Sequence, residues 1–392
     1  MADNVKHVKE PLMHLTRRLN VSKKYAWTIR IIFGVLSIFV CALVSYLISP
    51  KVTFGFFFKY LFEGAFGSLV TVRSLFVDLS ILLLLALAVT PCFKMRYWNI
   101  GGEGQAMMGA FGCTLVISYA TGKIPNAWVI ILSLAAAIAF AIVWALIPAI
   151  FKAKWNTNET LLTLMFNYIA ICLGAFLIKK VNPKGTGVLT FTEGVLATVG
   201  TNRTSLVFWV IVLTGIVITA LMFVYLYFSK HGYEITVVGE SSNTARYIGI
   251  NTKKVILRTL VLCGLLGGIV GFLLVSVKDV SFLSDNTMTS TVAGRGFTAV
   301  LISWLAHFNP LAMAVTSFLV VFITKGSNNV GNYARLGNSY ASILVGIFFF
   351  FIIATEFFIN FKINFRSNAV VPREPDDEPA VKEESVEIAK EA

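Results

Sequence analysis

The chain has 392 residues, of which 57% are hydrophobic and 14% charged, and its formal net charge is +13. An ordinary soluble domain carries about 25% charged residues, so this composition excludes a soluble globular protein. It also leaves no room for a folded basic domain of the kind that binds nucleic acid. Apolar runs of about 20 residues recur from one end to the other, and they predict an all-α integral membrane protein.

Residues 1–26 form a basic segment that precedes the first apolar run. Its cations are Lys6, Lys9, Arg17, Arg18, Lys23 and Lys24, and Leu12, Leu15 and Leu19 give it a short amphipathic pattern. Excess Lys and Arg mark cytoplasmic segments, so we expect this one at the cytoplasmic membrane face. It is not predicted to be a cleaved signal, because the apolar run after it is longer than the about 7–15 residues of a signal peptide.

The apolar runs predict about ten spans within one transmembrane domain, residues 27–360. The expected helices are about 27–48, 74–93, 105–121, 127–151, 159–178, 206–228, 255–276, 296–306, 310–325 and 339–359. Residues 51–73 are aromatic and interrupted by charges, which is typical of an interfacial or re-entrant helix. An even number of spans places both termini in the cytoplasm, and residues 361–392 are predicted to be an acidic, disordered tail.

The segments between the spans alternate between the two sides of the membrane. The polar segment 179–205 is expected outside and the basic segment 229–254 inside. Asn156, with Glu159 three residues later, predicts a capping box at the start of the fifth span. Glycines at 264, 267, 268 and 271 give the seventh span a small-residue face that favours close helix packing.

The stretch from Asn99 to Gln105 interrupts the apolar pattern between the second and third spans. Its glycines are Gly101, Gly102 and Gly104, and its polar side chains are those of Asn99, Glu103 and Gln105. Hydrocarbon offers no partner to an exposed backbone group, so such a break is tolerated only beside protein or a watery cavity. It therefore predicts part of a translocation path. The alternative is a tight turn with Glu103 solvated at the membrane interface.

A second Gly-rich break, Gly294-Arg-Gly-Phe297, follows the first helix of the second half of the chain. Spans two to five and spans seven to ten would then each carry a break after their first helix, and the two sets start from opposite sides of the membrane. This arrangement is typical of inverted-topology repeats with a site near their interface. No residue-level repeat accompanies it.

The segment 239–250 is the second informative stretch. Thr244 to Tyr247 are predicted to form a short helix, which one of residues 241–243 would cap and Gly249 would end. A short capped helix in a cytoplasmic loop is typical of an element on which a motor subunit docks. The alternative is an ordinary basic loop.

The chemistry of common enzymes and metal sites is missing from the sequence. There is no phosphate-binding loop, no His-Glu-x-x-His pattern and no clustered His, Ser or Asp set within the spans. The five cysteines all fall in apolar runs without metal-ligand spacing, and we expect neither a metal nor a cofactor in this chain.

Three ordered motifs together resemble a known family. They are Asn99 to Gln105, the run from Asn158 to Tyr168 and the segment 239–250, and Gly294 to Phe297 followed by Asn309-Pro310 fits as well. The chain is similar to the permease subunits of ABC importers, and within these to the nucleoside branch of the simple-sugar (ribose-type) permeases. The resemblance covers roughly residues 60–360. One departure is Trp98, where the family commonly has Phe.

The resemblance implies a type II ABC importer-like permease of the cell membrane with several partners. These are a cytoplasmic ATPase that binds ATP and Mg²⁺, a second permease that is usually a different chain, and an extracytoplasmic substrate-binding lipoprotein. The segment 239–250 would be the coupling helix, with Gly239, Glu240, Thr244, Ala245, Arg246, Gly249 and Ile250 as its candidate residues.

For the translocation path the candidates are Asn99, Glu103, Gln105 and Asn167, and the helix breaks lie at Gly101, Gly102, Gly104, Gly294 and Gly296. The polar side chains could hydrogen-bond cargo hydroxyls, or could instead satisfy broken backbone. The expected cargo is a nucleoside, with a ribose- or galactose-type sugar as the alternative. An ion-coupled secondary transporter is a further alternative, with Glu103, Glu356 and Asp78 as its available carboxylates.

Overall fold

The computed structural model describes residues 13–18, 22–183, 187–198, 203–284 and 290–365. The chain divides into two compact units, one formed by residues 34–352 and the other by residues 1–33 with 353–392. The larger unit holds the predicted breaks and the coupling segment. The expected disordered tail lies outside the described residues from 366 onward.

Helices make up nearly all of the described secondary structure. They are α1 Lys23–Ile48, α2 Phe54–Phe66, α3 Leu69–Lys94, α4 Gly102–Ala120, α5 Asn126–Trp155, α6 Glu159–Val181, α7 Arg203–Phe228, α8 Lys230–Glu240, α9 Ser242–Tyr247, α10 Thr252–Phe272, α11 Arg295–Leu305, α12 Pro310–Ala334 and α13 Gly337–Asn360, with a π-helical extension η2 Leu273–Lys278 and a 3-10 turn η1 Leu196–Thr198. The strands are β1 Met13–Arg17, β2 Val188–Thr190, β3 Ser281–Leu283 and β4 Phe361–Phe365.

The helix lengths confirm an all-α integral membrane fold. Eight of the described helices are long and apolar enough to cross a membrane, and α11 is apolar but short. The expected number of ten spans is therefore not confirmed, because α4 and α11 fall outside this set. Helix α2 has 13 residues and spans about 20 Å, too short to cross the hydrocarbon core.

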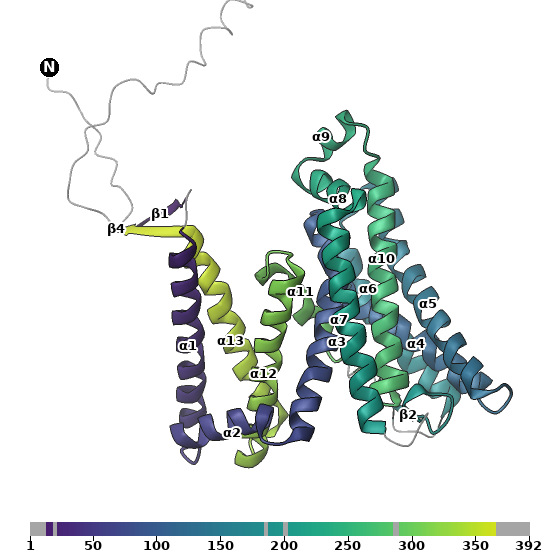
Figure 1. Ribbon diagram of the computed structural model, residues 1–392, viewed down its shortest axis with the longest axis horizontal. Coiled ribbons are helices and arrows are strands. Elements are labelled where there is room, and N and C mark those ends of the chain that lie inside the picture. The colour runs from purple at the N-terminus through teal and green to yellow at the C-terminus, as the bar shows by residue number, and fades with distance from the viewer. Residues whose placement is uncertain (1–12, 19–21, 184–186, 199–202, 285–289, 366–392) are drawn as a thin grey trace, which may run out of the picture. The chain divides into compact units, whose positions relative to one another are not determined.

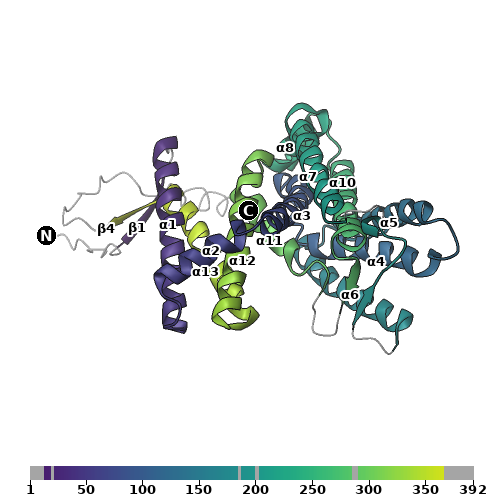
Figure 2. The same cartoon turned by 60° about the horizontal axis from the view of Figure 1, so that its bottom comes forward.

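The larger unit is built around α4, whose residues 102–110 are all buried. Helices α5, α6 and α10 pack against it, and Figure 2 shows them beside it. The glycine face of α10 makes this packing close, since a Cβ on Gly268 would lie 2.6 Å from the Cα of Ile138 in α5. The predicted small-residue face is thus confirmed as the contact surface of α10.

The segment 229–254 contains more helix than the sequence predicts. Ser229 caps α8, and Ser241 ends α8 and begins α9. In Figure 1 these two helices lie together at one end of α3, α7 and α10, while β2 lies near the other end. A Cβ on Gly239 would overlap the carbonyl oxygen of Lys94, so α8 sits directly on the end of α3.

One predicted cap is wrong. Asn158, and not Asn156, is the N-cap of α6, and its side chain accepts a hydrogen bond from Leu161 N at 3.2 Å. Asn156 instead ends α5 in the left-handed region, with φ of 50°. Asn tolerates this conformation better than most residues, so it serves as a C-terminal stop.

The smaller unit pairs β1 with β4 in an antiparallel ladder from Met13–Phe365 to Arg17–Phe361. Next to the ladder, Arg30 Nη2 donates to Glu356 Oε1 over 3.1 Å. The described part of the basic N-terminal segment is thus joined to residues that follow α13.

Candidate functional site

The break at 99–105 is folded around the side chain of Asn99. Its Oδ1 accepts hydrogen bonds from Gly101 N at 3.0 Å and from Gln105 Nε2 at 3.4 Å. Asn99, Glu103 and Gln105 are 0, 1 and 2% exposed. The alternative of a tight turn with a solvated glutamate is therefore wrong.

Helix α6 supplies the remaining partners of this backbone. Asn167 Oδ1 accepts from Gly104 N at 2.8 Å, and its Nδ2 donates to the carbonyl of Ile100 at 3.0 Å. Thr163 Oγ1 accepts from Ile100 N at 3.2 Å. The polar side chains that the sequence singles out thus satisfy the backbone groups that the helix break leaves open, as buried backbone requires.

Glu103 connects the two Gly-rich breaks. Its Oε1 accepts from Gly294 N at 2.9 Å and from Ser290 Oγ at 3.2 Å, and its Oε2 accepts from Gly296 N at 2.8 Å. These N–H groups belong to the first turn of α11, where the helix dipole favours a negative charge. A carboxylate from one half of the chain therefore caps a helix from the other half. We call Glu103, Gly294 and Gly296 the junction.

The two backbones approach so closely at the junction that only glycine fits. A Cβ on Gly296 would overlap the backbone nitrogen of Glu103. Gly294 begins α11 with φ of 75°, a conformation that glycine adopts without strain. The sequence pattern marked both breaks, but their contact follows from the packing of α4 against α11.

A charged cluster beside the junction is the feature that the sequence reading missed. Asp78 of α3 lies 3.0 Å from Lys278 Nζ, 3.7 Å from Arg295 Nη2 and 2.5 Å from Lys325 Nζ. Asp78 is the tenth residue of α3, about 14 Å along the helix from its start. The sequence does contain a signal for this cluster, namely isolated charges inside the apolar helices α3 and α12. Of these, only Asp78 was named above as an available carboxylate.

The charged cluster borders a cavity of about 400 Å³ between α3, α11, α12 and α13. Asp78, Arg295 and Lys325 are the charged residues of its wall, and the aliphatic part comes from Leu82, Val320, Val321 and Val345. Charges at membrane depth are costly and usually mark a pathway for a substrate or an ion. We call this space the Asp78 cavity.

The predicted coupling segment presents a small exposed helix. Ser241 Oγ accepts from Thr244 N at 3.2 Å, and Gly249 follows the helix with φ of 82°. This confirms the predicted cap and stop. Tyr247 is 91% exposed, whereas Ala245 is fully buried and anchors α9 to the rest of the unit.

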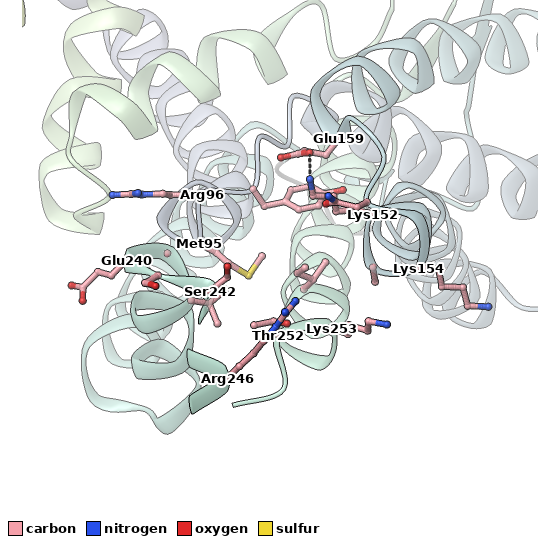
Figure 3. A pocket seen from close by; sticks show the side chains of 17 residues that line it. Met95, Arg96, Lys152, Lys154, Glu159, Glu240, Ser242, Arg246, Thr252 and Lys253 are labelled. Atoms are coloured by element: carbon pink, nitrogen blue, oxygen red, sulfur yellow. Dashed lines mark ion pairs between the residues drawn. The ribbon is translucent and has the colours of Figure 1, made fainter. Parts of the chain in front are cut away.

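A second cavity, of about 750 Å³, lies beside α9 (Figure 3). Its wall includes the cations Arg96, Lys152, Lys154, Arg246 and Lys253 and the acids Glu159 and Glu240. Lys152 Nζ and Glu159 Oε2 form an ion pair over 2.8 Å, drawn as a dashed line in Figure 3. The other four cations have no ion-pair partner within the described part of the chain, so the surface around α9 is basic.

An ion pair ties α8 to α10 below this surface. Arg258 Nη2 donates to Glu234 Oε2 over 2.6 Å. The hydrogen bond from the Arg258 guanidinium lowers the pKa of the Glu234 carboxyl below its ordinary value. Because α8 carries α9, this pair helps to hold the exposed helix in place.

Comparison with known protein families gives a match over most of the larger unit. A family model described as branched-chain amino acid transport system / permease component matches residues 71–353. This range contains both breaks, the Asp78 cavity and the coupling segment.

Curated relatives are similar over most of their length. A glucose ABC transporter permease protein of Haloferax volcanii is 24% identical over 351 residues, which is 86% of this chain and 90% of that protein. A nucleoside ABC transporter permease protein of Lactococcus lactis is 25% identical over 313 residues, 77% of this chain and 84% of that protein. A guanosine ABC transporter permease protein of Bacillus subtilis is 23% identical over 312 residues, 78% of this chain and 86% of that protein.

Proposed function

The chain belongs to the family of branched-chain amino acid transport system permease components. Within this family, we propose that it carries nucleosides across the cell membrane. It is a multi-pass permease subunit of an ATP-driven ABC transporter, a system in which a separate ATPase hydrolyses ATP. Nucleoside cargo is supported by two relatives named as nucleoside and guanosine permeases, each covering more than three quarters of this chain.

The family implies an ATPase and a substrate-binding protein, and we propose where each of them contacts this chain. The ATPase contacts the segment 239–250, and the observation that favours this is the exposed, capped α9 beside a basic surface. A second permease, a different chain, completes the membrane unit. An extracytoplasmic lipoprotein docks on the segment 179–205, of which residues 184–186 and 199–202 lie outside the described residues.

We assign the junction to the gate of the translocation path. Asn99, Gln105 and Asn167 hold the backbone of the break in shape, and Glu103 ties it to the start of α11 through two hydrogen bonds and to Ser290 through a third. In this proposal the path opens when the two breaks move relative to each other as rigid pieces. In this proposal the hydrogen bonds that give the four side chains their structural role are the same ones that change when the gate opens.

The transport cycle needs two packings of the helices that are close in free energy. ATP binding to the ATPase pair moves α9, and α8 transmits this motion because it lies against the end of α3. Helix α3 carries Asp78 and leads directly into the break at 99–105. Nucleotide then biases the equilibrium between the outward and inward arrangements.

Reconstitution tests the proposal. The chain, a partner permease, their ATPase and their lipoprotein are placed in proteoliposomes, and uptake of radiolabelled uridine and guanosine is measured. Uptake is expected only with ATP inside and lipoprotein outside, and a proton or sodium ionophore leaves it unchanged. Uptake that runs without ATP and stops with the ionophore would contradict the proposal and support an ion-coupled carrier.

A sugar is the second candidate cargo. The observation that favours it is the glucose permease relative, which covers 86% of this chain. The same proteoliposomes distinguish the two when D-ribose, D-galactose and D-glucose replace the nucleosides. Uptake of sugars alone would replace nucleoside by sugar and leave the rest of the assignment in place.

A further inference from the structure

We infer that the Asp78 cavity is the place where cargo contacts this subunit, and that it accepts an uncharged molecule with several hydroxyl or carbonyl groups and one apolar face. This inference rests on the proposed function, because it assigns a contact site on the proposed translocation path. The site joins residues of four helices that lie far apart in the sequence, namely α3, α11, α12 and α13.

The size and the lining of the cavity fit a small polar molecule. Ligand pockets commonly have volumes of about 300–1,000 Å³ with mostly apolar walls and a few polar groups, and this one has about 400 Å³. Leu82, Val320 and Val345 provide an apolar surface that a flat ring can cover. The polar groups of the wall come from all four helices.

Several polar groups in the wall are available to a ligand. Asn328 and Ser342 line the cavity, and neither side chain hydrogen-bonds to another described residue. Lys325 donates to Asp78 and to Ser74 Oγ, at 2.6 Å, so one of its three N–H donors is left over. Asp78 Oδ2 holds Lys325 and has room for a second donor, such as a cargo hydroxyl.

Three residues of the cavity wall are charged, Asp78, Arg295 and Lys325, and their charges balance once the charged residues beside them are counted, which favours an uncharged cargo. Arg295 and Lys325 are the cations of the wall, and Lys278, which is not part of the wall, contacts Asp78 and lies 3.7 Å from Asp279 Oδ1. The three carboxylates near them are Asp78, Asp279 and Glu103, the last of which binds the backbone on both sides of Arg295. A charged cargo would add a charge without a partner beside this balanced set, at a cost in free energy.

The cluster also ties α3 to η2, α11 and α12, so a purely structural role has to be tested against ligand contact. Cysteine labelling does this without depending on transport. The exposed Cys172 is replaced by Ser, the buried natural cysteines are kept, and Asn328→Cys or Ser342→Cys is introduced into the full complex. Labelling by a small methanethiosulfonate reagent is followed with and without millimolar uridine or guanosine.

Labelling at both positions is expected to slow at least threefold when nucleoside is present. Asn332→Cys is the matched control, because it lies one turn further along α12 and does not line the cavity. Its labelling rate is expected to stay the same. Equal rates with and without nucleoside at 328 and 342, in a complex that takes up uridine, would overturn the inference.

Failure of the inference can be told apart from failure of the proposed cargo. Protection by D-glucose or D-ribose but not by nucleosides would keep the cavity as the contact site and correct the cargo. A combined Asn328→Ala and Ser342→Ala variant adds a second measure, in which half-maximal protection of Thr298→Cys needs about three- to tenfold more nucleoside. An unchanged nucleoside requirement, or a loss of thermal stability as the only effect, would assign the cluster to structure alone and contradict the inference.

Discussion

Glu103 is the residue on which the two Gly-rich breaks depend. It is 1% exposed, and its carboxylate accepts from Ser290 and from the backbone N–H groups of Gly294 and Gly296. Hydrogen bonds to a charged acceptor are about twice as strong as neutral ones, and a buried donor that loses its partner is costly. A single side chain therefore holds the start of α11 against the start of α4.

Glu103→Gln tests this role. The amide keeps the shape but turns one acceptor into a donor that faces a backbone N–H, so we expect a loss of about 2–3 kcal/mol in the free energy of unfolding. Nucleoside uptake by the reconstituted complex should fall at least tenfold. Thermal unfolding of the purified complex and initial uptake rates provide the measurements. Glu63→Gln, which removes a carboxylate whose side chain is 43% exposed on α2, is the control. If Glu103→Gln and Asn99→Ala both leave uptake unchanged, the gate assignment is wrong.

Gly296→Ala tests the close approach of the two breaks. The added methyl group overlaps the backbone of Glu103, and overpacking of this kind costs about 1–3 kcal/mol. Gly346→Ala is the matched control, because a Cβ there has nothing within 4 Å and Ala is the better helix former. A lower melting temperature for Gly296→Ala, with an equal or higher one for Gly346→Ala, is expected. If Gly296→Ala had the same melting temperature as the unmodified chain, the two breaks would accommodate the methyl group by moving apart at little cost.

At the scale of secondary-structure elements, α8 and α9 form a lever at one end of the bundle. Ala245 anchors α9, and the side chain of Tyr247 is left exposed. Helix α8 presses on the end of α3 at Gly239 and is tied to α10 by the ion pair of Glu234 with Arg258. A force applied to α9 thus reaches α10 and α3, the helix that precedes the break at 99–105.

Ala245→Pro tests whether α9 couples ATP hydrolysis to transport. Proline removes the hydrogen bond from Ala245 N to the carbonyl of Ser241 and costs about 3 kcal/mol inside a helix. We expect ATPase activity of the complex to continue while cargo uptake falls. Ser242→Pro is the control, because the first helical position tolerates proline and Ser241 before it is extended. Uptake that stays proportional to ATP hydrolysis in Ala245→Pro would remove the coupling assignment.

The Glu234–Arg258 ion pair predicts a pH dependence. The pKa of Glu234 is lowered in the folded protein, so the pair stabilises the fold above the ordinary carboxyl pKa of 4.5. This stability is lost as the pH falls through the lowered pKa. The melting temperature of Glu234→Gln is therefore expected to lie below that of the unmodified chain at pH 7, and the gap should close at lower pH. A gap that is the same at pH 7 and pH 3 would show that Glu234 acts through packing.

At the scale of the whole molecule, the two halves of the larger unit meet through equivalent parts. Helix α11 packs against α3, and α4 packs against α10, so the helix after each break contacts the first helix of the other half. This exchange is what inverted repeats would produce, and the junction would then lie near their axis. The repeat itself stays a prediction, because no residue-level symmetry supports it.

Membrane orientation is a prediction at the same scale. We expect α9 inside the cell and the segment around β2 outside, with both termini inside. In intact cells that carry the Cys172→Ser background, a membrane-impermeant thiol reagent should label Thr190→Cys and leave Tyr247→Cys unmodified. Inside-out vesicles should reverse the pattern. Labelling of Tyr247→Cys from outside would invert the proposed topology and separate α9 from a cytoplasmic ATPase.

The class of the protein, the approximate positions of most of its long helices and the two Gly-rich breaks follow from the sequence without the structure. Helix bounds followed from apolar runs and caps, because a bilayer demands long apolar segments with internally bonded backbone. The expected end of α12 at residue 325 fell short of Ala334, and α8 was missed, because polar helices that pack on other helices lack the apolar run.

The roles of the polar residues follow from how the helices pack. The fold brings Glu103 to Gly294 and Gly296, and it gathers Asp78 with cations from three other elements, two of which line one cavity with it. The periodicity and composition of a segment indicate whether its faces are apolar or polar, and they do not indicate which residues those faces contact. The partner of a buried charge is chosen by the packing of helices that lie far apart in the chain, and a single sequence carries no record of that choice.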